Sequence, residues 1–291
     1  MLNAVVTAAA LLLALGAAPA PTPLFASASI GNGITLHYVA EGRGRPVIFV
    51  HGSLSDYDYW EEQVPAFAPR YRAIAYSRRY DFPNVNPPRN GYSAITDADD
   101  LARFIQTLRL GKVDVIGHSY GAFTALLLAI RHPGLVRSLV LAEPPVVSLL
   151  PQSQQDEMRR NMVEPMRSAF LKHDDGAGIA VFMGYVFHDP RAWQKMSPSS
   201  HAQTLRDARK WEVMMTRGTL FPYVDQRAIR DLRVPVLLMT GTKTYPFLTV
   251  ITRRLAQLLP NSRTLVVKGA GHQMWLQQPQ LCRNAAEAFF R

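Results

Sequence analysis

The residues best suited to chemistry surround Ser119, in the segment Gly117-His118-Ser119-Tyr120-Gly121. This segment lies between a short apolar run, Val113 to Ile116, and a longer apolar stretch from Ala122 to Ile130. The pattern predicts a buried strand, a tight turn and a helix. A serine on such a turn exposes its hydroxyl at a helix N-terminus, where free N–H groups favour developing negative charge. We therefore predict that Ser119 is a nucleophile. The alternative is a surface turn that contains a serine by chance.

The segment His51-Gly52-Ser53 offers a complementary group, because it follows a short, wholly apolar run from Pro46 to Val50. Such a run is typical of a central strand, and backbone N–H groups in the loop after it can stabilise a negatively charged oxygen. We predict that the N–H groups of Ser53 and Tyr120 form an oxyanion hole. His51 fits a structural role in this loop better than a role as acid or base.

The elements that must position these loops are visible as an alternation of strand and helix patterns. Residues 34–39 predict an antiparallel strand, and apolar runs typical of buried strands occur at 71–76, 138–142, 234–240 and 263–267. Helices are predicted at 60–66, 246–259 and 279–290, and between a cap at Ser93 and a stop at Gly111. Strands alternating with helices favour the α/β class.

The N-terminus has the character of a targeting segment. Residues 1–28 carry no charged side chain, residues 4–18 are apolar, and Ala26-Ser27-Ala28 offers a small-x-small cleavage site. This pattern predicts a signal peptide over residues 1–28 and a secreted or periplasmic protein that starts near Ser29. An uncleaved membrane anchor is the alternative, although the apolar run is short for a span.

Composition limits the remaining possibilities. The chain has 291 residues, 48% of them hydrophobic, enough for one large domain or one domain with an insertion. The net charge of +10 is spread along the chain without an aromatic-interleaved basic stripe, so no nucleic-acid partner is expected. Cys282 is the only cysteine, so an internal disulfide is excluded. We expect Cys282 to lie buried on the last helix. We expect no metal and no cofactor.

Two further features leave alternatives open. Arg78 and Arg79 follow the strand 71–76. They either meet an anionic substrate group, or they pair with Asp81 or lie in solvent, and the second interpretation is favoured. Residues 146–230 are helix-like and contain no strong strand pattern. Large apolar side chains of this segment either line a pocket or form the segment's own core, and these are Phe182, Phe187, Trp193, Trp211, Met214 and Met215.

The serine turn, the His-Gly loop and a late glycine-flanked histidine, Gly269-Ala270-Gly271-His272, together resemble the α/β-hydrolase fold family. The resemblance implies a mostly parallel central sheet flanked by helices, with a helical cap inserted between strands. It divides the chain into a core of residues 29–145 and 231–291 and a cap of residues 146–230. It also implies that His272 is the general base, the alternative being an exposed loop histidine.

The acidic partner of the histidine departs from the commoner pattern of that family. Most relatives carry an Asp shortly after the strand at 234–240, where this chain has Thr244. Some branches place the acid one strand earlier, which here is Glu143 and preserves the order serine, acid, histidine. Glu143 could instead be a hinge residue paired with an arginine, with Asp225 and Asp231 as weaker candidates for the acid. Thr244→Ala is expected to cost little.

The resemblance implies a serine hydrolase in which His272 takes the proton of Ser119, Ser119 attacks a carbonyl carbon, and water releases the acyl group. A serine in this position argues against haloalkane dehalogenases and epoxide hydrolases, which use Asp there. We predict hydrolysis of a small to medium, largely apolar carboxylic ester or lactone. The alternatives are C–C bond hydrolysis, a cofactor-free oxygenase or perhydrolase reaction, and ligand sensing with slow turnover. The expected partner is a small-molecule substrate, without nucleic acid and, after processing, without membrane.

Overall fold

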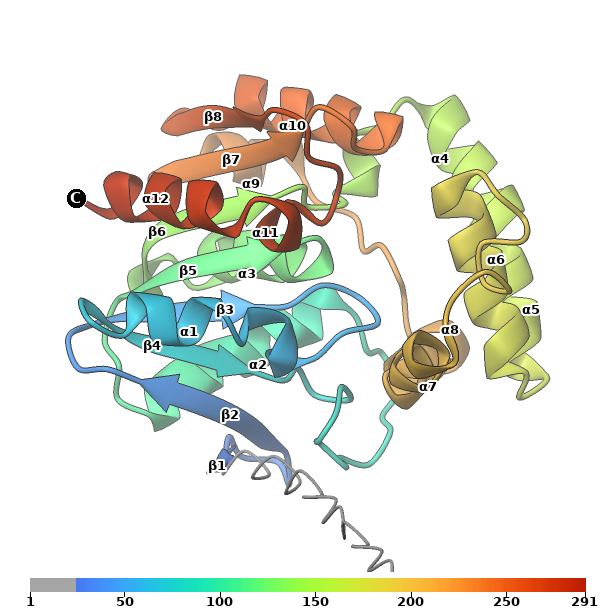
Figure 1. Ribbon diagram of the computed structural model, residues 1–291, viewed down its shortest axis with the longest axis horizontal. Coiled ribbons are helices and arrows are strands. Elements are labelled where there is room, and N and C mark those ends of the chain that lie inside the picture. The colour runs from blue at the N-terminus through green and yellow to red at the C-terminus, as the bar shows by residue number, and fades with distance from the viewer. Residues whose placement is uncertain (1–24) are drawn as a thin grey trace, which may run out of the picture.

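The computed structural model describes residues 25–291, which form an eight-stranded sheet in the order β1-β2-β4-β3-β5-β6-β7-β8 (Figure 1). The first two strands are antiparallel to their neighbours, and all other neighbouring strands are parallel. The strands are β1 (Ala26–Ser29), β2 (Thr35–Glu41), β3 (Arg45–Val50), β4 (Tyr71–Tyr76), β5 (Val113–His118), β6 (Val136–Ala142), β7 (Val236–Gly241) and β8 (Ser262–Val267). This arrangement confirms the predicted mostly parallel sheet.

Helices cover both faces of the sheet, as predicted, with α1 and α12 on one face and α2 and α3 on the other (Figure 1). Their bounds are α1 (Gln63–Phe67), α2 (Ala94–Thr107), α3 (Tyr120–Arg131), α4 (Gln152–Met158), α5 (Glu164–Leu171), α6 (Asp175–Phe187), α7 (Pro198–Arg206), α8 (Ala208–Arg217), α9 (Gln226–Arg230), α10 (Pro246–Leu258), α11 (Met274–Gln277) and α12 (Pro279–Phe290). Ser93 caps α2 through its side chain, which accepts a hydrogen bond from the N–H of Ile95.

Central strand β3 shows how the sheet separates two hydrophobic cores. Successive strand side chains point to opposite faces. Ile48 and Val50 therefore pack in the core that contains α2 and α3, whereas Val47 and Phe49 pack in the core that contains α1 and α12. All four side chains are fully buried, which explains why the sequence of this strand is apolar without alternation.

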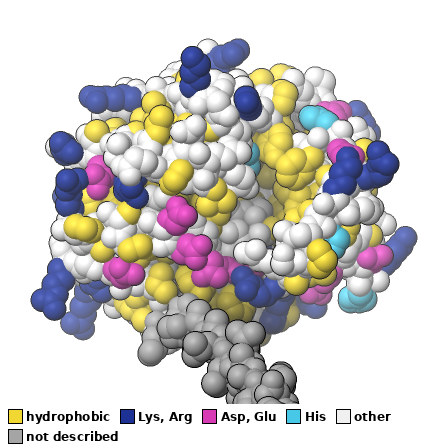
Figure 2. All heavy atoms as spheres, viewed as in Figure 1, with side chains coloured by type: hydrophobic (Ala, Val, Ile, Leu, Met, Phe, Trp, Pro, Cys, Tyr) yellow, Lys and Arg dark blue, Asp and Glu magenta, His cyan; other side chains and the backbone are white. Residues whose placement is uncertain are grey.

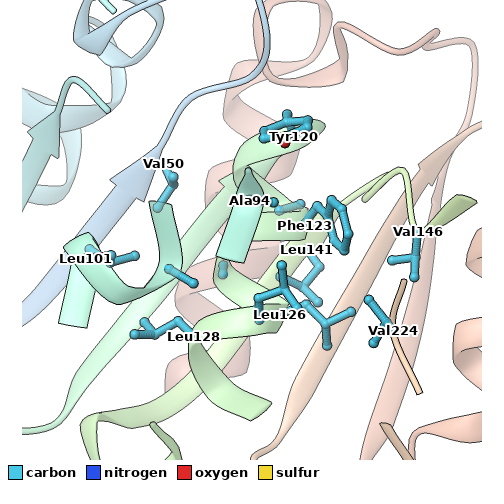
Figure 3. Close-up of a cluster of buried hydrophobic side chains, with 14 of the residues drawn as sticks. Val50, Ala94, Leu101, Tyr120, Phe123, Leu126, Leu128, Leu141, Val146 and Val224 are labelled. Atoms are coloured by element: carbon cyan, nitrogen blue, oxygen red, sulfur yellow. The ribbon is translucent and has the colours of Figure 1, made fainter. Parts of the chain in front are cut away.

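Helix α3 packs against the central strands of the sheet and directly follows Ser119. In Figure 3, Phe123 and Leu126 of this helix point toward Leu141 of β6 and toward Val146 and Val224. These side chains are at most a few per cent exposed. Burial of this helix on several sides fixes the turn that precedes it.

Residues between β6 and β7 form a helical cap, with helices α4 to α8 standing beyond the carboxyl ends of the parallel strands (Figure 1). A π-helical turn, Arg159–Val163, joins α4 to α5. Open α/β sheets bind ligands at the carboxyl ends of their strands, which is the edge that the cap covers. Within residues 25–291, no helix combines the length and the apolar character that a membrane span requires.

The sheet begins earlier than the sequence suggested. Ala26–Ser29 pair with Thr35–Tyr38 of β2, and Ala28 is buried. Cleavage after Ala28 would leave only Ser29 of strand β1. The predicted signal peptide otherwise falls on residues 1–24, outside the described residues, and stays a prediction.

Candidate active site

Ser119 occupies a strained turn between β5 and α3. Its backbone has φ 52° and ψ −122°, a left-handed region that non-glycine residues rarely adopt. Space explains the two glycines of the turn: a Cβ on Gly121 would lie 2.2 Å from the carbonyl oxygen of Val50, and one on Gly117 would lie 2.6 Å from Cα of Ala122. The turn therefore presents the serine hydroxyl at the N-terminus of α3, where the first backbone N–H groups have no partner within the helix.

The acid and the histidine, which lie far apart in the sequence, meet at the cavity that His272 and Ser119 both line. His272 Nδ1 and Glu143 Oε2 are 2.6 Å apart, so the predicted hydrogen bond between these residues is present. Glu143 directly follows β6 and is fully buried. It has a φ of 51°, and its side chain reaches across the end of β7. Because a carboxylate only accepts hydrogen bonds, the proton lies on Nδ1 and Nε2 is left as an acceptor.

Three further donors fix the carboxylate of Glu143. Its Oε1 accepts hydrogen bonds from the Thr240 hydroxyl at 3.0 Å and from the Gly241 N–H at 2.9 Å. Its Oε2 accepts a hydrogen bond from the Thr244 hydroxyl at 2.7 Å. Sequence reasoning identified Thr244 only as the place of a missing acid. Its contact with Glu143 is a reason to expect a larger loss of activity on its removal than the sequence indicated. The signal was available, since a hydroxyl beside a relocated carboxylate can donate to it.

Neighbouring side chains hold the loop that carries His272. Gln277 accepts a hydrogen bond from the N–H of Gly271 at 2.7 Å. His118 Nε2 lies 2.9 Å from the carbonyl oxygen of His272 and donates to it. Burial lowers the pKa of His118 well below its usual value, so this ring stays neutral and adds no charge next to His272. Tyr59 stacks on His118 with ring centres 4.8 Å apart.

The loop proposed to carry the oxyanion donor approaches the serine closely. A Cβ on Gly52 would lie 3.2 Å from Cβ of Ser119, and Ser53 lines the same cavity as Ser119. His51 is fully buried, donates from Nδ1 to the Gly52 carbonyl at 3.0 Å, and accepts from the Arg78 backbone N–H at 3.2 Å. Burial, reinforced by the charge of Arg78, lowers the pKa of His51 well below its usual value. This geometry gives His51 a structural place in the loop.

Both arginines after β4 are engaged by carboxylates inside the protein. Arg78 donates to the Gly52 carbonyl at 2.7 Å and lies 3.4 Å from Asp97. Arg79 binds Asp100 through two hydrogen bonds of 2.6 Å. Neither arginine lines the cavity next to Ser119. Arg78 also lies 3.5 Å from Asp81, as the favoured interpretation had it. Arg79 instead pairs with Asp100, and neither arginine lies in solvent.

The two weaker candidates for the acid lie away from the histidine. Asp225 caps α9 by accepting from the N–H of Arg227. Asp231 is exposed and pairs with Arg227 at 3.8 Å. Neither lines the cavity that contains His272. The geometry therefore favours Glu143.

A cavity of about 170 Å³ lies between the core and the cap, and we call it the catalytic cavity because Ser119 and His272 line it. Figure 2 shows hydrophobic side chains gathered around the hollow at this boundary. Three of the six apolar cap residues considered above line it, namely Phe182, Phe187 and Trp211. Within residues 25–291, its lining includes no Lys, Arg, Asp or Glu side chain. An uncharged, apolar group is the ligand that such a lining favours.

Comparisons with known proteins agree with this geometry. The profile of the alpha/beta hydrolase fold family matches residues 45–279. The chain is 28% identical over 273 residues to a 2-(acetamidomethylene)succinate hydrolase of Mesorhizobium japonicum, covering 88% of this chain and 91% of the relative. It is 30% identical over 262 residues to the non-heme chloroperoxidase CPO-A1 of Kitasatospora aureofaciens, covering 83% and 90%. The solved structure of the carboxylesterase CesB (YbfK) from Bacillus subtilis superposes with a TM-score of 0.71 at 20% identity, covering 93% and 92%.

Proposed function

This chain belongs to the alpha/beta hydrolase family and is a hydrolase, and we propose that it cleaves an uncharged, largely apolar carboxylic ester or lactone. The reaction proceeds through an acyl-enzyme on Ser119. The observation that carries the proposal is the hydrogen bond between Glu143 and His272 at the edge of an apolar cavity that Ser119 also lines.

In the proposed mechanism, His272 Nε2 accepts the proton of the Ser119 hydroxyl while the serine oxygen attacks the carbonyl carbon. The carbonyl oxygen becomes negatively charged and is held by the N–H groups of Ser53 and Tyr120. His272 then gives its proton to the departing alcohol. Water, deprotonated by the same nitrogen, attacks the acyl group and regenerates the serine. The Glu143 carboxylate stabilises the imidazolium that forms in both halves of the reaction.

The lining of the catalytic cavity supports an uncharged substrate. The name of the Mesorhizobium relative describes a substrate that is a succinate and therefore carries carboxylates. A carboxylate in an apolar cavity requires a cationic partner, because its desolvation is costly. The described lining of this cavity provides neither Lys nor Arg. A succinate-like substrate is therefore disfavoured for this chain.

A perhydrolase reaction is the second candidate, and it is favoured by the likeness to a protein named as a non-heme chloroperoxidase. It needs no further protein group. Hydrogen peroxide replaces water, attacks the acyl carbon on Ser119, and releases a peracid together with the free serine. The two reactions share every step up to the acyl-enzyme. Measuring how much peracid forms as the hydrogen peroxide concentration is raised separates them.

The test is a comparison of two p-nitrophenyl esters of the same length, the butyrate and the hemisuccinate, which differ in one terminal carboxylate. We expect kcat/KM for the butyrate to exceed that for the hemisuccinate at least tenfold, and Ser119→Ala to abolish both activities. Equal rates would overturn the assignment of an uncharged substrate. Activity that survives in Ser119→Ala would overturn the mechanism.

A further inference from the structure

We propose that Met158 sets the upper length of the acyl chain that the catalytic cavity accepts. The inference rests on the proposed ester hydrolysis. It concerns one side chain in the cap, the last residue of α4, which directly precedes the π-helical turn Arg159–Val163. Turns of this rare kind occur frequently at functional sites.

Met158 stands where three hollows of the molecule meet. It lines the catalytic cavity and also two neighbouring hollows of about 230 and 290 Å³. We call the first of these the α6 hollow, which Tyr185 and Val250 also line, and the second the α8 hollow, which Val163 and Met214 also line. Met158 is the one residue common to all three linings within residues 25–291. A side chain shared in this way is the part of the wall that borders all three hollows. Phe247 also lies between the catalytic cavity and the α6 hollow, and Leu220 and Phe221 also lie between the catalytic cavity and the α8 hollow.

The size of the catalytic cavity sets the expected limit. Its volume is about 170 Å³. A dry, apolar cavity of about 150 Å³ accommodates a benzene molecule, so this cavity has room for an acyl chain of about six carbons. The acyl group stays on Ser119 after the alcohol has left, and therefore it is the part of the substrate that the cavity must hold in both halves of the reaction.

Longer chains meet Met158, whose side chain is only 2% exposed. Truncation of Met158 would remove the one part of the wall that all three hollows share. It would extend the cavity toward two hollows that are each larger than the cavity itself. Each methylene that gains a buried place raises kcat/KM by up to about fourfold, because burial of one methylene is worth about 0.8 kcal/mol. Two additional methylenes then give a gain of more than tenfold.

Met183 provides a matched control. It lies on α6, is buried, and lines the catalytic cavity but neither the α6 hollow nor the α8 hollow. Met183→Ala removes the same side chain from the same cavity without opening a wall. The two variants thus differ in whether the cavity is extended or only locally widened.

The experiment measures kcat/KM for p-nitrophenyl esters with acyl chains of two to twelve carbons. The wild type is expected to prefer chains of about four to six carbons. Met158→Ala should raise the ratio of the decanoate to the butyrate rate at least tenfold, and Met183→Ala should change it less than threefold. Met158→Val, which removes less volume, should shift the ratio in the same direction and serves if Met158→Ala does not fold. An unchanged ratio in both Met158 variants, or an equal rise in Met183→Ala, would overturn the proposal.

Binding of p-nitrophenyl alkyl ethers separates this inference from the proposed function, because an ether has no bond that the enzyme can hydrolyse. The nitrophenyl group quenches tryptophan fluorescence, and Trp211 lines the cavity. We expect Met158→Ala to improve the affinity for the decyl ether relative to the butyl ether at least tenfold. That result without any ester cleavage would support the role of Met158 and overturn the hydrolase proposal. Unaltered relative affinity would overturn the role of Met158.

Discussion

Replacement of Glu143 by glutamine should disable the site by reversing the tautomer of His272. The Gly241 N–H, 2.9 Å from Oε1, is a backbone donor and cannot become an acceptor. In Glu143→Gln, the amide oxygen must therefore keep that position, which directs the amide NH₂ toward His272 Nδ1. An NH₂ group requires an acceptor, so His272 loses its proton at Nδ1 and carries it at Nε2. In that state the ring cannot accept the proton of Ser119.

The expected magnitude follows from this reversal. Replacement of the carboxylate by an amide, with the geometry otherwise intact, lowers kcat by about 10⁴ in the serine-protease triad. That factor corresponds to about 5.4 kcal/mol of activation free energy at about 1.36 kcal/mol per tenfold. Glu143 has the same kind of contact, at 2.6 Å and fully buried, so we expect a loss of about 10³ to 10⁴ here.

The assay is kcat for the best p-nitrophenyl ester, with thermal unfolding as a check that Glu143→Gln is folded. Thr244→Asp in the Glu143→Gln background should restore part of the activity, because the Thr244 hydroxyl already lies 2.7 Å from the oxygen that contacts His272. A folded Glu143→Gln protein that retains more than a tenth of the wild-type kcat would refute the role of Glu143. It would leave the roles of the serine and the histidine open to separate tests.

Three other predictions concern the acid and the buried charges. Thr244→Val should lower kcat about tenfold, because a hydrogen bond to the buried carboxylate is lost, whereas Thr244→Ser should retain most of the activity. Lys210 is fully buried and lies 3.1 Å from both Asp81 and Asp97, so Lys210→Met should reduce the unfolding free energy in urea by about 3–5 kcal/mol, and no change would contradict the ion cluster. Burial raises the pKa of Asp207 to about 8, so the folded protein keeps a proton that the unfolded chain loses above about pH 4. This group should therefore lower stability as the pH rises from about 4 to 8, by up to about 1.4 kcal/mol per pH unit, and Asp207→Asn should flatten that part of a pH series of urea titrations.

The sequence was sufficient for the central part of the fold and for the contact between acid and histidine. The apolar run of β3 reflects burial of the strand on both faces. The glycines around Ser119 reflect the lack of room for a Cβ. Glu143 was identified through the family resemblance, in which some branches place the acid one strand earlier. The structure shows why this placement works, because β6 and β7 are neighbours in the sheet. The strand 71–76 and the helix 279–290 have the predicted bounds, because their hydrophobic patterns are local features of the sequence.

Features that depend on long-range packing were not predictable. Strand β1 has only four small residues, and its pairing with β2 stabilises it although its composition resembles a cleavage site. The cap offered a list of apolar residues but not their places, and Trp193 stacks on His201 instead of lining the catalytic cavity. The position of Met158 between three hollows likewise depends on how α4, α6 and α8 pack together.

The most direct test of the account is the mass of the intact protein during turnover of a slowly hydrolysed apolar ester, quenched in acid within the first seconds. We predict an adduct that corresponds to one acyl group, localised to Ser119 by peptide mapping and absent from Ser119→Ala. The adduct should decay as the product appears. Turnover by the wild type without any adduct, together with activity that persists in Ser119→Ala, would contradict the proposed acyl-enzyme mechanism.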